Sequence, residues 1–303
     1  MEKKMEGKEY YKDGKLKFEG EYLNGKRNGK GKEYYNGKLL FEGEYLNGKI
    51  WNGKGYNKND KIEFEIIDGK GYIKEYDYDG KLKFEGEYLN GKKNGKGKEY
   101  YKDGKLEFEG EYLNGERNGK GKEYYYNGEL LFEGEYLKGK IWNGKGYNIN
   151  DKIEFEIIDG KGYIKEYNFI NGKLVYEGEY LNGERNGKGK EYYSHGELEF
   201  EGEYLNGKKN GKGKEYDYDG KLVFEGEYLN GEKWNGKGKG YNYFDGKLEF
   251  EGEYLNGKRN GKGKRYYDVK LIFEGEYLNG KRKWKKNIIL IMMFLTLYYL
   301  DNY

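Results

Sequence analysis

The sequence has no cysteine, no proline, no alanine and no glutamine among its 303 residues. The lack of cysteine excludes disulfides, thiolate metal ligands and thiol redox chemistry. Serine, threonine and histidine occur once each, as Ser194, Thr296 and His195, so side chains suited to nucleophilic catalysis are scarce. The first fifteen residues contain no apolar run of the kind found in secretory signals. We therefore expect a cytoplasmic location.

The residue types that remain are few, with 53 glycines and 38 tyrosines. Such a bias is typical of internal repetition rather than of an ordinary packed domain. Aromatic residues make up 18% of the chain, which argues against disorder because disordered segments are poor in aromatic side chains. The 58 basic residues nearly balance the 55 acidic ones. The resulting net charge of +3 gives no general attraction to nucleic acid.

One five-residue phrase, Phe or Tyr followed by Glu-Gly-Glu-Tyr, recurs through the chain. It begins at Phe18, Phe41, Phe84, Phe108, Phe132, Tyr176, Phe200, Phe224, Phe250 and Phe273. Most steps are 23 or 24 residues, and the two that are nearly twice as long each contain a degenerate copy, at Phe64 and Phe155. Residues 40–76 also recur 91 positions later with only two substitutions. The sequence therefore predicts twelve units, formed in part by duplication of a four-unit block.

Each unit alternates between two classes of residue with the period of a β-strand. In the first copy Phe18, Gly20 and Tyr22 would share one face, while Lys17 and Glu19 would lie on the other. Because the glycine has no side chain, a ring from a neighbouring strand can lie over its backbone, so we expect the rings to stack along the array. The Glu and Lys residues of the opposite face can form cross-strand pairs.

Pairs of Asn or Asp with Gly separate the strands. Such pairs at 13–14, 36–37 and 103–104 are typical of tight hairpin turns, since glycine accepts the positive φ that these turns need. Further pairs at 24–25 and 28–29 indicate a second, looser turn. We therefore expect an all-β protein, an elongated single sheet of antiparallel hairpins. Each hairpin would be stable only through its neighbours.

The stretch F-E-G-E-Y-L-N-G-K-R-N-G-K-G-K, with Gly20, Gly25, Gly29 and Gly31 in the spacing G-x4-G-x3-G-x-G, resembles the MORN repeat. It is also similar to the variant G-K-x-K-E-Y-Y-x-N-G-K-L-x-x-E-G-x-Y-x-N-G-K of bacterial proteins, some of them associated with toxin–antitoxin systems. The resemblance covers residues 7–280. It implies an array of antiparallel hairpins that acts as a scaffold, binds proteins or sometimes associates with phospholipid, and it implies no catalysis by the repeats. Tyr replaces the Trp of many relatives, and two copies carry one extra residue.

The aromatic face is the predicted surface for a protein partner. Its rings would form an exposed strip, or they would serve only to stack the units or to close a homodimer. The residues predicted to form the strip are Phe18, Tyr22, Phe41, Tyr45, Phe84, Tyr88, Phe108, Tyr112, Phe132 and Tyr136. The repeated N-G-K-x-N-G-K-G-K loops offer a second surface, because lysines beside free backbone N–H groups can receive anionic phospholipid. The alternative for these loops is a solvated row of turns.

Two local patterns resemble catalytic or nucleotide sites, and neither meets the chemical requirement. Residues 48–54 and 139–145 match G-x4-G-K, but a glycine follows where a phosphate-binding loop has Ser or Thr. Ser194 and His195 are neighbours in a turn, without the third orienting group and oxyanion site that a nucleophile needs. We therefore expect no catalytic residues, no metal site, no cofactor and no enzyme activity.

The last residues depart from the repeat. An apolar segment at 288–300 follows a basic cluster that comprises Lys281, Arg282, Lys283, Trp284, Lys285 and Lys286. Thirteen helical residues would span about 20 Å, less than the roughly 30 Å of a hydrocarbon core. A transmembrane helix is therefore not expected, whereas contact of the basic cluster with a membrane surface is feasible. The favoured interpretation is that the tail is a repeat unit translated out of frame, with weak membrane contact as a by-product.

We thus divide the chain into a repeat array at 7–280 and a tail at 281–303. The predicted function is a non-catalytic scaffold for protein–protein interaction through its aromatic and charged sheet faces. The expected partner is a protein or a second copy of the chain, and not a nucleic acid. Two alternatives are peripheral binding to anionic phospholipid, through the Lys-Gly loops or the tail, and an antitoxin-like protein that neutralises a toxin.

Overall fold

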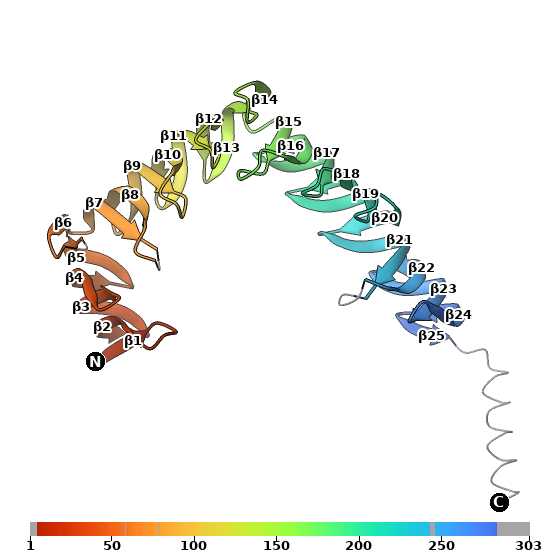
Figure 1. Cartoon of the computed structure of the whole chain (residues 1–303), viewed down its shortest axis with the longest axis horizontal. Coiled ribbons are helices and arrows are strands. Elements are labelled where there is room, and N and C mark those ends of the chain that lie inside the picture. The colour runs from red at the N-terminus through yellow and green to blue at the C-terminus, as the bar shows by residue number, and fades with distance from the viewer. Residues whose placement is uncertain (1–4, 58, 78, 243–245, 284–303) are drawn as a thin grey trace, which may run out of the picture. The chain divides into compact units, whose positions relative to one another are not determined.

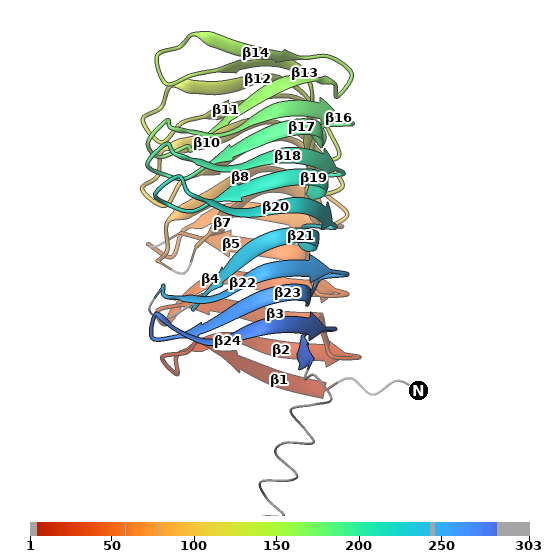
Figure 2. The ribbon, with the colours of Figure 1, turned by 90° about the vertical axis from the view of Figure 1, so that its right-hand side faces the viewer.

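The computed structural model describes residues 5–57, 59–77, 79–242 and 246–283. These residues form strands joined by turns, without a helix, which confirms the all-β prediction. The chain divides into two compact units, Met1–Lys173 and Leu174–Tyr303. Within each unit, antiparallel strands lie side by side in the order of the sequence (Figure 1, Figure 2).

The first unit contains strands β1 to β15. Their bounds are β1 Met5–Tyr10, β2 Leu16–Leu23, β3 Lys26–Tyr35, β4 Lys38–Leu46, β5 Lys49–Tyr56, β6 Ile62–Ile67, β7 Lys70–Tyr76, β8 Leu82–Leu89, β9 Lys92–Tyr100, β10 Leu106–Leu113, β11 Glu116–Tyr124, β12 Leu130–Leu137, β13 Lys140–Tyr147, β14 Ile153–Ile157 and β15 Gly162–Tyr167. Strands β1 to β14 form one sheet. The expected single sheet is interrupted after β14, because β14 and β15 are joined only by an isolated bridge between Ile158 and Lys161, which lie just outside the two strands.

The second unit contains strands β16 to β25, paired in sequence order. Their bounds are β16 Leu174–Leu181, β17 Glu184–Tyr192, β18 Leu198–Leu205, β19 Lys208–Tyr216, β20 Leu222–Leu229, β21 Glu232–Tyr241, β22 Leu248–Leu255, β23 Lys258–Tyr267, β24 Lys270–Leu278 and β25 Lys281–Lys283. The repeat was expected to end at 280, whereas the sheet continues through Lys283.

The register of the strands aligns the glycines of successive repeats in one row. Gly20 of β2 lies opposite Gly31 of β3, and Gly31 lies opposite Gly43 of β4. The same pairing recurs in the second unit, where Gly252 of β22 lies opposite Gly263 of β23. Backbones can approach rings closely only where the Cβ is missing, so this row sets where aromatic side chains pack.

Aromatic rings lie over this glycine row and form the core of each unit. Phe108 is fully buried and contacts Tyr112 of its own strand and Tyr136 of the next repeat edge-to-face, with ring centroids 5.6 and 5.3 Å apart. A Cβ built on Gly121 would lie 2.6 Å from Phe108 Cζ, closer than packed carbons approach. The predicted stacking of rings along the array is therefore confirmed. The contacts are T-shaped, a geometry that the quadrupoles of aromatic rings favour.

A layer of cations closes the core. Arg117 stacks on the ring of Phe108 with its Cζ 4.0 Å from the ring centroid. Its guanidinium also pairs with Glu123 of its own strand and, at 2.7 Å, with Glu99 of the preceding repeat. The same arrangement recurs with Arg27 on Phe18, where the guanidinium pairs with two glutamates. Each such cation joins consecutive repeats electrostatically as well as by packing.

Strict strand alternation is broken by a bulge before each buried ring. Glu9 of β1 lies opposite Phe18, and the next pair is Tyr10 opposite Leu16. Lys17 is therefore the extra residue of the bulge. Lys17 was expected on the charged face, but its Nζ lies 3.9 Å from Glu9 Oε2, on the side of Phe18. The expectation for Lys17 was wrong because one extra residue in a bulge turns the side chains before it to the other face.

The Asn-Gly pairs behave in two ways. Asn36 and Gly37 have positive φ of 47° and 78°, which confirms the predicted hairpin turn. Asn24 has φ of 50° and begins the second turn. The pair at 28–29, predicted to be part of that turn, instead lies within β3, where Asn28 Oδ1 accepts a hydrogen bond from the backbone N–H of Asn47 at 3.0 Å. This pair serves to connect neighbouring hairpins rather than to turn the chain.

Candidate binding surface

The face of each sheet opposite the rings carries a groove whose floor is the glycine row. We call it the glycine groove. Its first segment, of about 660 Å³, has the floor glycines Gly7, Gly20, Gly31 and Gly43; its second, of about 680 Å³, has Gly97, Gly110, Gly121 and Gly134. Both lie in the first unit. A segment of about 1220 Å³ in the second unit has Gly238, Gly252, Gly263 and Gly275.

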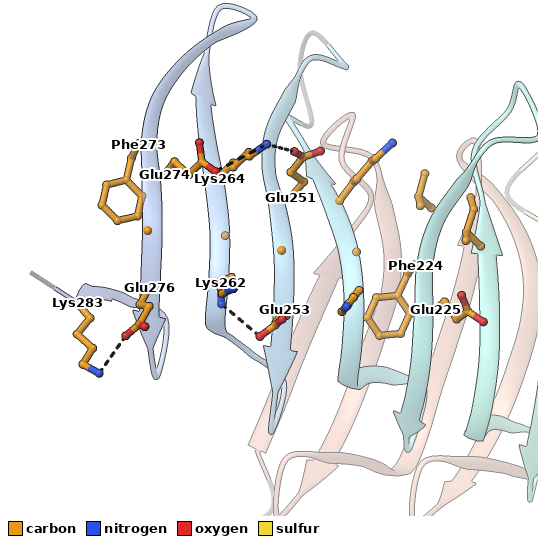
Figure 3. A pocket seen from close by; sticks show the side chains of 18 residues that line it. Phe224, Glu225, Glu251, Glu253, Lys262, Lys264, Phe273, Glu274, Glu276 and Lys283 are labelled. Carbon is orange, nitrogen blue, oxygen red and sulfur yellow. Dashed lines mark hydrogen bonds and ion pairs between the residues drawn. The ribbon is translucent and has the colours of Figure 1, made fainter.

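Lysine and glutamate form the walls of the groove in alternation. In the second unit Lys264 lies between Glu251 and Glu274 along one wall, with Nζ to Oε distances of 3.7 and 4.0 Å (Figure 3). The walls consist of the residues before and after each floor glycine, so they are roughly 7 Å apart along the strand. Lys122 and Glu133 make the same cross-strand contact in the first unit, at 2.9 Å. The predicted cross-strand pairs on the charged face are therefore confirmed.

The wall nearer the turns is held by backbone hydrogen bonds. The N–H of Lys262 donates to Glu253 at 3.2 Å (Figure 3), and the N–H of Lys120 donates to Glu111 at 3.0 Å. Because these carboxylates are occupied by backbone donors, the lysine side chains beside them project toward solvent. The turn side of the groove thus presents exposed lysines whose backbone N–H groups hold the neighbouring carboxylates.

A row of tyrosines borders the other wall. Tyr34 donates its hydroxyl hydrogen to Glu19 at 2.8 Å, and Tyr216 donates to Glu201 at 2.8 Å. Burial raises the pKa of Tyr34 to about 12, and the hydrogen bond to Glu19 adds to this rise. The hydroxyl therefore remains a donor at neutral pH, and it keeps the glutamate of the wall in one orientation.

The residues predicted to form an exposed aromatic strip lie in the core instead. Nine of the ten are buried: Phe18, Phe41, Tyr45, Phe84, Tyr88, Phe108, Tyr112, Phe132 and Tyr136. The tenth, Tyr22, is half-buried and donates to Glu9 at 2.7 Å. The expectation of an exposed strip is corrected because the rings pack against the glycine row and against one another. Cations cover several of them, such as Phe18, Phe84 and Phe108. The alternative that the rings hold the units together is the one that this packing supports.

The cation layer was missed by the sequence reasoning, although the sequence contains a signal for it. Where the cation is replaced by isoleucine, as at Ile50 and Ile141, the glutamate of the same strand is replaced as well, by Gly55 and Gly146. Gly55 lies opposite Phe64, whose ring occupies the place that a side chain at 55 would take. Loss of the charge pair is thus accompanied by apolar packing at the same position.

The residues predicted to contact a membrane are only partly described. Lys281, Arg282 and Lys283 form β25, and Lys283 Nζ lies 3.0 Å from Glu276 in the wall of the groove (Figure 3). Trp284, Lys285 and Lys286 lie outside the described residues, as does the apolar segment at 288–300. No helix with the length and apolarity needed to span a bilayer occurs in the described part of the chain.

The turn that contains Ser194 and His195 shows no catalytic geometry. The imidazole stacks on Tyr193 and Tyr218, with centroid distances of 5.5 and 5.3 Å, and its Nε2 lies 3.2 Å from the carbonyl oxygen of Tyr218. This packing accounts for the histidine as part of the turn. Among the described residues no group of His, Cys, Asp and Glu could hold a metal ion.

Comparison with known protein families gives matches along the repeat array. The family described as MORN repeat matches residues 18–38, 84–105, 108–129, 176–197, 200–221 and 250–268. The family described as MORN repeat variant matches residues 3–24 and 70–90. Together these matches cover just over half of the chain. A comparison with curated proteins finds no match.

Solved structures give only distant similarity. The structure titled "Crystal Structure of TcdB2-TccC3-Cdc42" is 11% identical, with a TM-score of 0.19, over 90% of this chain and 17% of that chain. The Tc holotoxin pore of Photorhabdus luminescens is 11% identical, with a TM-score of 0.18, over 91% of this chain and 18% of that chain. The chain spans less than a fifth of these proteins, and similarity at this level supports no argument about function.

Proposed function

Since the chain belongs to the MORN repeat proteins, we propose that it is a non-catalytic scaffold that holds a protein partner in the glycine groove. The repeats of this family serve in general for interaction with proteins or membranes. The observation that carries the proposal is the groove itself, an open surface with a backbone floor and charged walls that recurs in both units.

The alternation of charge along the walls favours a polypeptide. A uniformly charged polymer, such as a nucleic acid, would meet as many like charges as opposite ones along the wall of Glu251, Lys264 and Glu274. A polypeptide can carry both signs at matching intervals. The floor offers glycine Cα atoms, and in the second unit Phe224 and Phe273 also line the groove, so small apolar side chains of the partner can lie against it.

The ion pairs of the walls are suited to exchange. Lys122 and Glu133 keep 43% and 48% of their side-chain surface exposed, and exposed pairs contribute only about 0–1 kcal/mol each. A partner's charges can therefore replace them with little loss of stability. Repetition of the same walls along each unit adds avidity, because a partner bound at one segment reaches the next as a tethered ligand.

The test exchanges the two charges of one wall pair. A chain with Lys122→Glu and Glu133→Lys keeps the ion pair and the net charge but inverts the pattern that a partner would meet. We expect proteins captured from the native host by the original chain to be lost with this variant. The same exchange at Asp103 and Lys105, a 3.4 Å pair in a turn outside the groove, is the control and should leave capture unchanged.

Two results would contradict the groove as the binding surface. The first is capture of the same proteins, in the same amounts, by all three chains. The second is no specific capture at all, together with salt-sensitive pelleting of the chain with anionic vesicles. That second result would support the peripheral membrane alternative. Capture of a toxin that the chain inhibits would refine the proposal to an antitoxin-like protein.

A further inference from the structure

One repeat of the second unit carries a cation at a position where several other repeats carry an acid that balances the cation layer. In strand β11, Glu123 lies between Phe108 and Phe132 of the neighbouring strands. The equivalent residue of β23 is Arg265, which lies between Phe250 and Phe273. An acid at this position accepts from the cations on either side, and an arginine there cannot.

Two further arginines occupy the cation positions on either side of Arg265. Arg259, six residues earlier in β23, stacks on Phe250 with its Cζ 4.3 Å from the ring centroid. Arg282 of β25 lies 5.1 Å from the centroid of Phe273. Both arginines are half-buried and Arg265 is exposed. Arg259 and Arg265 lie on β23 and Arg282 lies on β25, with β24 between them. The register places all three residues on the ring face, around Phe250 and Phe273.

The acids that pair with such cations elsewhere are missing here. Arg117 pairs with an acid six residues later and with one in the preceding repeat, and Lys209 of the second unit pairs with Glu191 of the preceding repeat at 2.8 Å. For Arg259 the first position is Arg265, and the second is Gly240, which lies opposite Phe250. None of the three arginines forms an ion pair with a residue that the structure describes.

The other groups near Arg259 do not supply the missing charge. Tyr254 lies opposite Arg259 in the register and its side chain interacts with the guanidinium. A hydroxyl can accept a hydrogen bond but brings no negative charge. Glu249 is the equivalent of Glu107, which approaches Arg117 to 3.8 Å. Among the described residues Glu249 forms no ion pair with Arg259, and its carboxylate accepts a hydrogen bond from the amide of Asn242 at 2.8 Å.

We propose that Arg259, Arg265 and Arg282 form a binding site for a phosphate group. Guanidinium groups match tetrahedral oxyanions through pairs of parallel hydrogen bonds. A carboxylate carries one charge, and Glu99 and Glu191 each serve two cations. Three cations without an acid match the roughly two negative charges of a phosphate monoester or of inorganic phosphate at neutral pH. The site is on the ring face and is therefore separate from the glycine groove.

The first experiment titrates the full chain with inorganic phosphate, at constant ionic strength set with chloride, and follows thermal unfolding and heat of binding. We expect saturable binding with one phosphate per chain, and a transition temperature that rises with phosphate as a ligand of the folded state requires. The Arg265→Glu variant restores the acid seen at Glu123. It should unfold at a higher temperature than the original chain without phosphate, and it should lose the phosphate response.

A matched control separates this site from general charge effects. Lys270→Glu makes the same change of net charge at an exposed residue of β24 and should keep the phosphate response. An equal rise in transition temperature for all three chains would overturn the proposal, because phosphate stabilises proteins in general by exclusion from their surface. Absence of a saturable heat of binding in the original chain would overturn it as well.

Vesicles identify the source of the phosphate. The chain is sedimented with vesicles of neutral phosphatidylcholine and with vesicles that also contain phosphatidic acid. Pelleting that needs phosphatidic acid and is lost in Arg265→Glu assigns the site to a lipid headgroup. Binding of inorganic phosphate without pelleting assigns it to a soluble phosphorylated ligand. Either result supports the arginine site, whereas pelleting that is the same in Arg265→Glu contradicts its use for lipid.

Discussion

At the scale of single residues, the pairing of glycine with an aromatic ring decides how the sheets are packed. Gly263 of β23 lies beside Phe250 and Tyr277, and a Cβ there would lie 2.7 Å from Phe250 Cε2 and 3.2 Å from Tyr277 Cδ2. Gly240 of β21 has more room, because a Cβ there would find its nearest neighbours at 3.7 Å. The two glycines therefore have different tolerance for a methyl group.

We predict that Gly263→Ala destabilises the protein by about 1–3 kcal/mol, the usual effect of overpacking a core. Gly240→Ala, in the same unit and also outside the left-handed region of φ, should be neutral or stabilise by up to about 1 kcal/mol through a less flexible unfolded chain. Urea unfolding of the two variants measures the difference. Equal midpoints for both would show that the rings do not pack against the glycine row.

At the scale of elements, each hairpin turn is connected to the hairpin before it. The turn at Asn47 receives two such contacts: its backbone N–H donates to Asn28 Oδ1 at 3.0 Å, and the N–H of Gly48 donates to the carbonyl oxygen of Arg27 at 2.8 Å. The same pair of bonds recurs at Lys138 and Gly139. A repeat is therefore held to its neighbour at the turns as well as through the core, as expected for an array in which no hairpin is stable alone.

The turn between β23 and β24 departs from the Asn-Gly pattern and provides the second prediction. Asp268 and Val269 have φ of 47° and 60°, and the left-handed region costs a residue with a Cβ about 1–2 kcal/mol. Val269 is exposed, so its side chain contributes little packing. Val269→Gly should therefore stabilise the protein by about 1 kcal/mol, seen as a higher midpoint of urea unfolding.

The control is the reverse change in an ordinary turn. Gly37 follows Asn36 in the hairpin between β3 and β4 and has φ of 78°, with no atom near the place of a Cβ. Gly37→Val should lower the midpoint, because the strain enters without any steric contact. A lower midpoint for Val269→Gly would instead show that the valine makes a contact important for folding.

At the scale of the whole molecule, the tyrosines make stability depend on alkaline pH. Burial raises the pKa of Tyr34, Tyr101, Tyr193 and Tyr216 to about 12, against about 10 for tyrosine in an unfolded chain. A pKa that is higher in the folded state stabilises the fold while the group is protonated. This contribution is complete below pH of about 10 and is lost as the pH rises toward 12.

We therefore predict that the transition temperature falls steeply between pH of about 10 and 12. In the same range, tyrosinate absorbance of the folded chain should appear at higher pH than that of the chain in concentrated urea. The two absorbance titrations provide the measurement. If they coincide, the tyrosine hydroxyls are not held by burial and hydrogen bonds in the folded chain, and the prediction is wrong.

Much of this architecture follows from the sequence alone, because its determinants are local. Strand alternation, hairpin dipeptides and a small residue beside each ring lie within a few positions of one another, so strands, turns and stacked rings could be predicted. The candidate site could be predicted only in part. The charged face with its cross-strand pairs follows from alternation, whereas the groove requires knowing that Gly20, Gly31 and Gly43 align across three strands.

Only the tertiary structure decided which rings are covered and how charges are matched between repeats. Arg117 pairs with Glu99, eighteen positions earlier in the sequence. A bulge turns Lys17 toward the ring face, although alternation predicts it on the charged face. The duplicated segment shows the limit most directly. Residues 62–71 and 153–162 have the same sequence, and both keep the pair of Ile67 with Lys70 or of Ile158 with Lys161, while only the first copy adds Ile66 opposite Gly71. The local sequence therefore does not by itself set how far two strands pair.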